Sequence, residues 1–120
     1  MSVAQLLGGS LREAVPAYAS LHNYTPAPDL SDELASAVRA AKVSGFKALK
    51  MKIGGRPLRE DLRYLRLARE VAGDNPDLVA DANQTYTVPM AIKVGRLLEE
   101  LDFAWFEEPI PIEKYRANER

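Results

Sequence analysis

Cysteine is absent from this sequence of 120 residues, and histidine occurs only once, as His22. Without cysteine the chain can form no disulfide, no thiolate metal site and no cysteine nucleophile, and the redox compartment stays undetermined. A single histidine also makes zinc a poor candidate for any metal site. The chemistry of this protein therefore has to come from other side chains.

An excess of charge of one sign is also missing, as are long apolar runs. The chain has 16 basic and 17 acidic side chains, a formal net charge of -1 and 47% hydrophobic residues, which describes one soluble globular unit. There is no basic stripe, so we expect neither nucleic acid nor a membrane surface as a partner. Residues 1–9 lack the basic and apolar regions of a signal peptide or membrane anchor. A cytoplasmic location is the default expectation.

Hydrophobic periodicity predicts an alternation of strands and helices. The expected strands lie at residues 15–19, 48–53, 78–82 and 103–107. The expected helices run from Ser31 to near Gly45, from Leu58 to near Gly73, and from Thr87, as the capping residue, to near Leu101. The comparable spacing of the strands predicts a parallel sheet with right-handed crossovers, an α/β fold. A doubly wound open sheet and a segment of a (β/α)8 barrel share this pattern. The glycines at 54 and 55 match neither a dinucleotide-binding motif nor a P-loop.

Two lysines lie on the second predicted strand. Lys50 and Lys52 are two residues apart, so their side chains point to the same face, and their apolar neighbours predict that this face is partly desolvated. Two adjacent ammonium groups lower each other's pKa, which is one route to a lysine that acts as a base near neutral pH. An edge strand with two solvated lysines would carry the same pattern.

Polar pairs also close the third and fourth predicted strands. Asp81 and Asn83 have the same spacing at the end of the third strand, and Glu107 and Glu108 end the fourth. Carboxylates from neighbouring strand ends suit a hard cation such as Mg²⁺, which takes oxygen ligands. A helix-capping turn at Asp81 and a solvated strand end at Glu107 are the alternatives. Three polar pairs at successive strand ends do match the place where α/β barrels keep their active sites.

Three stretches appear in order and at fitting separation: residues 45–54 (GFKALKMKIG), 78–84 (LVADANQ) and 104–109 (AWFEEP). Together they resemble the barrel domain of the mandelate racemase and muconate lactonizing family of the enolase superfamily. Within that family the resemblance is strongest to mandelate racemase and the sugar-acid dehydratases. The resemblance runs from Leu6 to Pro109. It implies a partial (β/α)8 TIM barrel, with roughly the first four parallel strands and their intervening helices.

The resemblance also implies roles for the polar residues. Lys52 would remove the proton α to a substrate carboxylate, and Lys50 would lie beside it, depress its pKa and touch the carboxylate. Asp81 and Glu107 would be two of three carboxylate ligands of an essential Mg²⁺, which stabilises the negative charge created by proton removal.

Two further positions match residues of the family that contact the metal shell or the substrate. Asn83 would reach the metal shell or a substrate hydroxyl, and Ser20, just after the first strand, would contact the substrate. Tyr86 and His22 are near the expected mouth of the site, with a loop role as the simpler expectation.

The matches to the family are partial. The family's third metal carboxylate comes from the fifth strand, a His-Asp pair on the opposite side comes from the sixth and seventh, and a capping domain precedes a barrel of about 250 residues. We therefore expect residues 1–120 to form the N-terminal half of the barrel domain, without the capping domain or the second half, and to be inactive in isolation.

Two interpretations of the function remain open at the level of sequence. The chain is either part of a Mg²⁺-dependent isomerase or lyase acting on a hydroxy acid or sugar acid, or a non-catalytic half-barrel scaffold. The residues would serve a racemase, an epimerase, a cycloisomerase or a dehydratase, and the run from Glu107 to Pro109 leans toward the dehydratases. In either case the first and fourth strands would be unpaired edges that favour a homo-oligomer.

Overall fold

The computed structural model describes residues 1–9, 12–21 and 31–117. In chain order its elements are α1 (Val3–Leu6), β1 (Ala19–Leu21), α2 (Ser31–Val43), β2 (Ala48–Lys52), α3 (Leu58–Ala72), β3 (Asp77–Asp81), α4 (Val88–Glu100), β4 (Trp105–Glu107) and the 3₁₀ helix η1 (Ile112–Ala117). Strands and helices alternate after α1, as the hydrophobic periodicity predicts.

The four strands form one parallel sheet in the order β1-β2-β3-β4. β2 and β3 share the longest register, from Ala48 opposite Asp77 to Lys52 opposite Asp81. β1 pairs with β2 on its other side, and β4 pairs with β3. β2 and β3 are therefore central strands, and β1 and β4 form the two edges of the described sheet.

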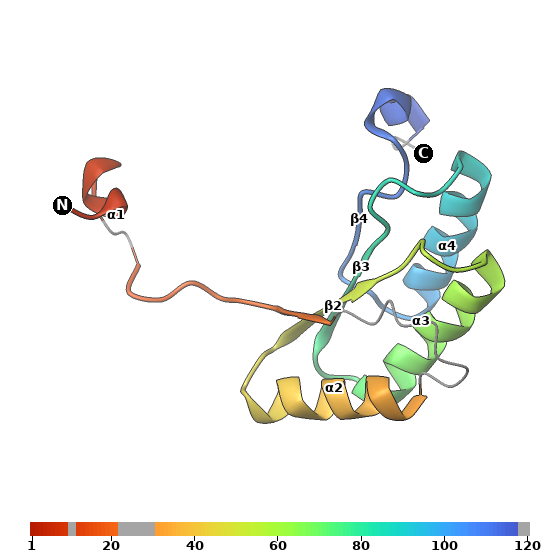
Figure 1. Ribbon diagram of the computed structural model, residues 1–120, viewed down its shortest axis with the longest axis horizontal. Helices are drawn as coiled ribbons and strands as arrows, with labels where there is room; N and C mark the ends of the chain where they lie inside the picture. The colour runs from red at the N-terminus through yellow and green to blue at the C-terminus, as the bar shows by residue number, and fades with distance from the viewer. Residues whose placement is uncertain (10–11, 22–30, 118–120) are drawn as a thin grey trace.

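The three long helices α2, α3 and α4 cover one face of this sheet (Figure 1). A doubly wound sheet carries helices on both faces and reverses its strand order, whereas a barrel segment keeps its strands in sequence order with all helices outside. The observed order and the single helical layer therefore decide between the two α/β alternatives in favour of a partial barrel.

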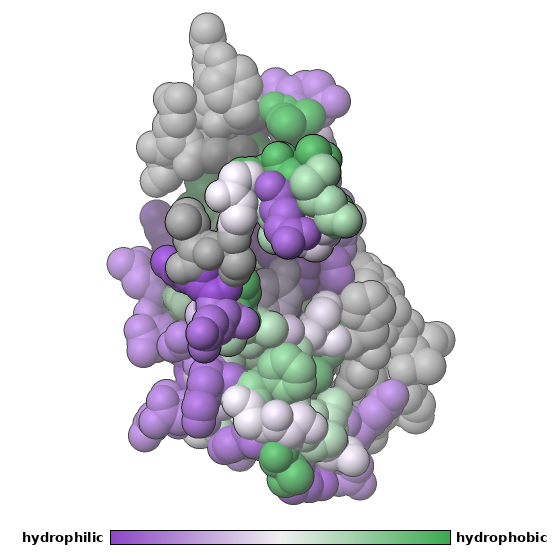
Figure 2. Space-filling view, turned by 90° about the vertical axis from the view of Figure 1, so that its left-hand side faces the viewer, coloured by the Kyte–Doolittle hydropathy of each residue, from purple (hydrophilic) through white to green (hydrophobic). Residues whose placement is uncertain are grey.

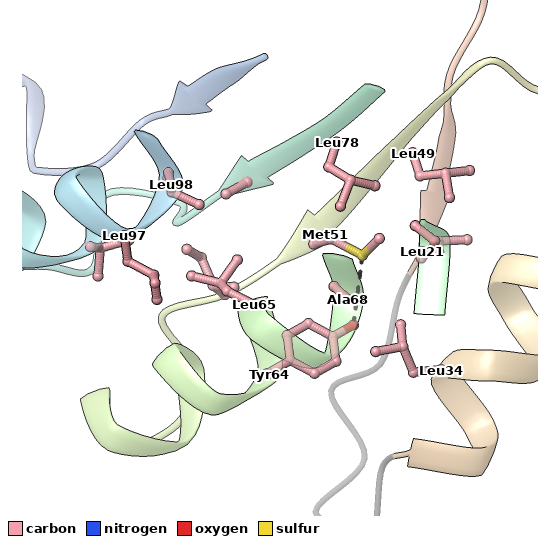
Figure 3. Close-up of a cluster of buried hydrophobic side chains, with 14 of the residues drawn as sticks. Leu21, Leu34, Leu49, Met51, Tyr64, Leu65, Ala68, Leu78, Leu97 and Leu98 are labelled. Carbon is pink, nitrogen blue, oxygen red and sulfur yellow. Dashed lines mark hydrogen bonds between the residues drawn. The ribbon is translucent and has the colours of Figure 1, made fainter. Parts of the chain in front are cut away.

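The hydrophobic core lies between the sheet and the helices. Leu49 and Met51 of β2 are fully buried, as are their register partners Leu78 and Ala80 on β3. The side chains that they meet come from all three helices: Leu34, Tyr64, Leu65, Ala68, Leu97 and Leu98 (Figure 3). Because side chains alternate along a strand, Lys50 and Lys52 lie on the face opposite the helices.

The helix ends follow local signals in the sequence. α3 begins at Leu58 with Glu60 and Asp61 in its first turn, and it ends at Gly73, whose φ of 71° suits a glycine. α4 begins after Thr87, with Pro89 in the first turn. Thr87 is the N-cap residue of α4, as predicted, but its side chain makes no capping hydrogen bond.

The first strand also differs from its prediction. The apolar run at residues 15–19 is extended and exposed for most of its length, and β1 covers Ala19–Leu21 instead. Pairing with β2 decides the position, since Ala19 to Leu21 are the residues that face Leu49 to Met51. Ser20 therefore lies within the strand and not after it.

The N-terminal segment projects away from the sheet and helices (Figure 1). Its large apolar side chains are exposed, among them Val3, Leu6, Leu7 and Val15. Seen from that side, apolar residues form several separate patches among hydrophilic ones (Figure 2). Within the described ranges, no helix has the length and apolar character needed to cross a membrane.

Candidate active site

The register of the sheet arranges the polar residues in two rows on the face opposite the helices. One row runs from Ser20 through Lys50 and Val79 to Trp105. The next row, nearer the carboxyl ends of the strands, consists of Lys52, Asp81 and Glu107. Three strands therefore bring two cations and two anions together, although these residues are far apart in the sequence.

Both lysines converge on Asp81. The Lys50 ammonium nitrogen lies 3.1 Å from Asp81 Oδ2 and 3.4 Å from Glu107 Oε1. Lys52 forms an ion pair with the same Asp81 oxygen and donates to Asn83 Oδ1 at 2.9 Å. The Lys50 nitrogen thus occupies a position between two carboxylates from neighbouring strands.

Asp81 is the centre of this cluster, with a side chain only 2% exposed. Burial by itself raises the pKa of Asp81, but the hydrogen bonds from Lys52, Lys50 and the Asn83 backbone N–H outweigh it, so the pKa lies below its ordinary value. The Asn83 N–H donates to Asp81 Oδ1 at 3.0 Å, so each oxygen of the carboxylate has a donor. Asp81 is therefore held as an anion at the end of β3.

The surroundings of Lys50 correct one prediction about the lysine pair. Burial lowers the pKa of Lys50, but hydrogen bonds to Asp81 and Tyr18 and the charges of Asp81 and Glu107 outweigh it, so the pKa is raised above its ordinary value. The predicted lowering of the Lys50 pKa by a neighbouring ammonium group is therefore wrong, because Asp81, Tyr18 and Glu107 raise this pKa more than burial lowers it. The alternative of a solvated edge strand is also wrong, since β2 is central and the Lys50 side chain is 11% exposed.

The remaining predicted residues lie at different positions around this cluster. Asn83 is exposed, has a φ of 47° and contacts Lys52 just beyond the end of β3. The Glu107 side chain is 34% exposed and lies at the rim. Ser20 is exposed in the row of Lys50. His22 lies outside the described residues.

Two aromatic residues near the cluster were missed by the sequence interpretation. Tyr18 and Trp105 make an edge-to-face contact with ring centroids 6.1 Å apart, and the Lys50 nitrogen lies 5.3 Å from the centre of the Tyr18 ring. Trp105 Nε1 also donates to Glu107 Oε2 at 3.5 Å. The sequence could have indicated both residues, because side chains two positions apart on a strand point to the same face. Tyr18 is two residues before Ser20, and Trp105 is two residues before Glu107.

The donor set fits a divalent cation in part. Asp81 and Glu107 are register partners whose oxygens both reach one cationic nitrogen, that of Lys50, so a single cation can contact both carboxylates. Oxygen ligands of this kind suit Mg²⁺. In the part of the chain that the structure describes, no group of three His, Cys, Asp or Glu side chains is placed to hold a metal ion. These residues therefore offer two of the ligands that such a site needs.

Comparison with known proteins identifies relatives over almost the whole chain. The sequence profile of the family described as "Enolase C-terminal domain-like" matches residues 33–119. Arabinonate dehydratase from Saccharolobus solfataricus is 41% identical over 111 residues, which cover 90% of this chain and 28% of the relative.

Solved structures agree with the sequence comparison. The 3,6-anhydro-D-galactonate cycloisomerase from Zobellia galactanivorans superposes with a TM-score of 0.84 and 34% identity, over 98% of this chain and 32% of that protein. A racemase from Streptomyces coelicolor A3(2) with bound magnesium superposes with a TM-score of 0.81 and 33% identity, over 95% and 31% of the two chains. The chain thus spans about a third or less of the proteins it matches. It belongs to the mandelate racemase and muconate lactonizing family of the enolase superfamily, whose members include dehydratases, cycloisomerases and racemases.

Proposed function

We propose that these residues form the metal-binding and base-carrying part of an active site that removes the proton α to the carboxylate of a hydroxy acid or sugar acid. The observation that supports this most directly is the convergence of Lys50, Lys52, Asp81 and Glu107 at the ends of three successive parallel strands. This end of a barrel is where catalytic residues are found, and its loops are free to vary with the substrate.

Each residue has a distinct role in the proposed reaction. Lys52 is the base that takes the α-proton, and Asn83, whose Oδ1 lies 2.9 Å from the Lys52 nitrogen, orients that nitrogen or a substrate hydroxyl. Lys50 stays charged and binds the substrate carboxylate from the row below. Ser20, in the same row as Lys50, contacts the substrate.

Mg²⁺ bound by Asp81 and Glu107 would neutralise the charge that develops on the substrate carboxylate, and it would replace the two ammonium groups as the partner of Asp81. In the structure Lys50 pairs with both carboxylates and Lys52 pairs with Asp81, and this positive charge between the carboxylates supports a cation site there. The third carboxylate and the opposing acid that the resemblance implies are not among the described residues. We therefore expect weak Mg²⁺ binding and little complete turnover by the 120 residues alone.

Titration with Mg²⁺ tests the proposed cation site, with the emission of Trp105 as the signal. Trp105 is the single tryptophan and its Nε1 lies 3.5 Å from Glu107 Oε2, so a cation at Glu107 should change its emission. Asp81→Asn and Glu107→Gln should abolish the response, whereas Glu108→Gln, at an exposed neighbour, should preserve it. A response that survives both Asp81→Asn and Glu107→Gln would place the cation elsewhere and contradict the proposal.

A non-catalytic scaffold that self-associates is the second candidate function. It is supported by the two edges of the sheet, β1 and β4, each paired on one side within the described residues. Light scattering with and without Mg²⁺ addresses it. A stable dimer that neither binds Mg²⁺ nor exchanges α-protons would favour the scaffold over the enzyme.

A further inference from the structure

A buried carboxylate lies in α3, away from the cluster just described. Asp61 follows Leu58 by three residues and precedes Leu65 by four, so it belongs to the apolar stripe of the helix, and its side chain is completely buried. Burying a carboxylate costs free energy unless its oxygens are paired. The contacts of Asp61 therefore call for a specific explanation.

Asp61 accepts two hydrogen bonds on one oxygen, and they come from two different loops. The Gly54 backbone N–H donates to Asp61 Oδ2 at 2.9 Å, and the Tyr86 hydroxyl donates to the same atom at 2.6 Å. Gly54 lies two residues after Lys52, and Tyr86 lies three residues after Asn83. One buried oxygen thus connects the loop after β2 to the loop after β3.

The two loops are also in direct steric contact at Gly54. Gly54 has a φ of +88°, and a Cβ added there would overlap Thr85 Oγ1 and lie 2.9 Å from the Ala82 carbonyl oxygen. The Thr85 hydroxyl is itself fixed, because it donates to the Ala82 carbonyl at 2.8 Å. The loops therefore have no space to move toward each other, and the hydrogen bonds to Asp61 keep them from separating.

The loop after β4 is joined to the same unit through backbone hydrogen bonds. The Gln84 N–H donates to the Glu108 carbonyl at 2.7 Å, and the Tyr86 N–H donates to the Pro109 carbonyl at 3.3 Å. The Tyr86 ring is buried and lies 6.4 Å from the Phe106 ring. Tyr86 is therefore not at the mouth of the site but beneath it, between the loops and the helical layer.

The ionisation of Asp61 argues against a role in stability alone. Its second oxygen, Oδ1, is buried with no hydrogen-bond partner among the described residues. Burial raises the pKa of Asp61, although hydrogen bonds from Tyr86 and Gly54 and the charge of Arg56 act in the opposite direction. An acid whose pKa is raised on folding loses stability as the pH rises from its unfolded toward its folded pKa. An apolar residue would avoid this cost, so the carboxylate is better explained by what it holds in place.

We propose that Asp61 and Tyr86 are positioning residues, which fix the loops after β2 and β3 so that Lys52 and Asn83 stay in contact beside Asp81. The inference rests on the proposed function for its consequence in catalysis, but the coupling of the loops is a property of the chain itself. It can therefore be tested without substrate or metal.

The test is NMR spectroscopy of the ¹⁵N-labelled 120-residue chain, with hydrogen exchange at Gly54 and the side-chain amide shifts of Asn83 as the two signals. Tyr86→Phe removes one donor and keeps the ring, Asp61→Leu removes the acceptor, and Asp61→Asn keeps an oxygen acceptor. Tyr64→Phe is the matched control. Tyr64 lies in α3 and is as buried as Tyr86, and the hydrogen bond observed for its hydroxyl within the described residues goes to Met51 Sδ, at 4.0 Å (Figure 3).

We expect Tyr86→Phe and Asp61→Leu to accelerate exchange at Gly54 about five- to tenfold, the effect of one lost hydrogen bond. Both should also shift the Asn83 side-chain amide, whereas Asp61→Asn and Tyr64→Phe should leave that signal near its original position. If Asp61→Leu does not fold, Tyr86→Phe decides the question alone. Unchanged Asn83 signals in Tyr86→Phe, or equal changes in Tyr64→Phe, would overturn the proposal.

Mg²⁺ affinity separates this inference from the proposed function. If the parent chain gives no Mg²⁺ response while the NMR signals behave as expected, the cation site fails and the coupling of the loops stands. If the parent chain binds Mg²⁺, Tyr86→Phe should weaken binding severalfold, whereas Asp61→Asn should keep most of the parent's affinity.

Discussion

Lys50 contacts Asp81 across the sheet although the two residues are not register partners. Asp81 lies opposite Lys52, and Lys50 lies opposite Val79, yet the Lys50 nitrogen reaches Asp81 Oδ2 at 3.1 Å. The long lysine side chain extends toward the carboxyl end of its strand, so one carboxylate receives both cations. A substitution at Asp81 therefore affects two lysines at once, and a substitution at either lysine leaves Asp81 one cation.

On the proposed function, Lys52→Met should strongly slow exchange of the α-proton of a hydroxy acid in D₂O with saturating Mg²⁺. Exchange needs one base, since Lys52 can remove the proton, equilibrate with solvent and return a deuteron, so it does not require the opposing acid. Loss of a general base lowers such rates by about 10²- to 10⁴-fold. The exposed Lys47, just before the same strand, gives the control Lys47→Met. Proton NMR of the substrate measures the rate, and equal exchange in Lys52→Met and the parent would contradict the assigned base.

Asp81 should make the stability of the chain depend on pH at the acidic end. Its pKa is lowered on folding from an ordinary value of 3.8, so its contribution is fully present above 3.8 and is lost as the pH falls through the folded pKa. Denaturant unfolding from pH 7 down to about pH 2 should show this loss, and Asp81→Asn should reduce it. At pH 7 the same substitution should cost about 3–5 kcal/mol, because it removes the carboxylate that pairs with both the buried Lys50 and the partly buried Lys52.

Asp77→Asn is the control for that experiment, since Asp77 is an exposed residue at the start of the same strand. It should change the stability at pH 7 by less than about 0.5 kcal/mol, as surface substitutions usually do. If the free energy of unfolding falls as steeply with decreasing pH in Asp81→Asn as in the parent, other carboxylates dominate the pH dependence.

Gly54→Ala should destabilise the chain more than Gly45→Ala does. Both glycines have a left-handed φ, +88° and +85°, so both substitutions carry the backbone cost of about 1–2 kcal/mol. A Cβ at Gly45 meets no atom within 4 Å, whereas one at Gly54 overlaps Thr85, which should add about 1–3 kcal/mol. Thermal unfolding of the two variants measures the difference. Equal losses would show that the loops after β2 and β3 can separate freely.

Arg69 should be the most sensitive arginine of α3. Its guanidinium donates to the Leu101 carbonyl at 2.8 Å and to the Asp102 carbonyl at 2.6 Å, and it lies 5.6 Å from the centre of the Phe103 ring. Lysine cannot reproduce a planar group with several donors, so Arg69→Lys should cost about 1–3 kcal/mol. Arg66→Lys, at an exposed position of the same helix, should cost much less. Chemical unfolding compares them, and similar losses would contradict the assignment.

Much of the fold could be predicted because its signals are local. The periodicities of residues 31–45, 58–73 and 87–101 predicted α2, α3 and α4 to within a few residues, and three of the four strands were predicted in the same way. β1 was misplaced because the apolar residues at 15–19 carry a strand signal of their own, whereas the strand is defined by pairing with Leu49 to Met51. Pairing is a property of two segments, and the sequence of one does not contain it.

The sequence by itself determined which residues lie at the carboxyl ends of β2, β3 and β4, because the period of a strand and the order of a parallel sheet follow from local pattern. Tertiary structure alone decided which of them meet. Lys50 and Glu107 are 57 positions apart, and whether carboxylates or a second ammonium dominate the pKa of Lys50 depends on distances of 3–4 Å between strands. The same holds for Asp61 and Tyr86, whose hydrogen bond joins a helix to a loop 25 residues away. Contacts of this length arise only when the chain is packed, because they require side chains from separate elements to reach the same few ångströms of space.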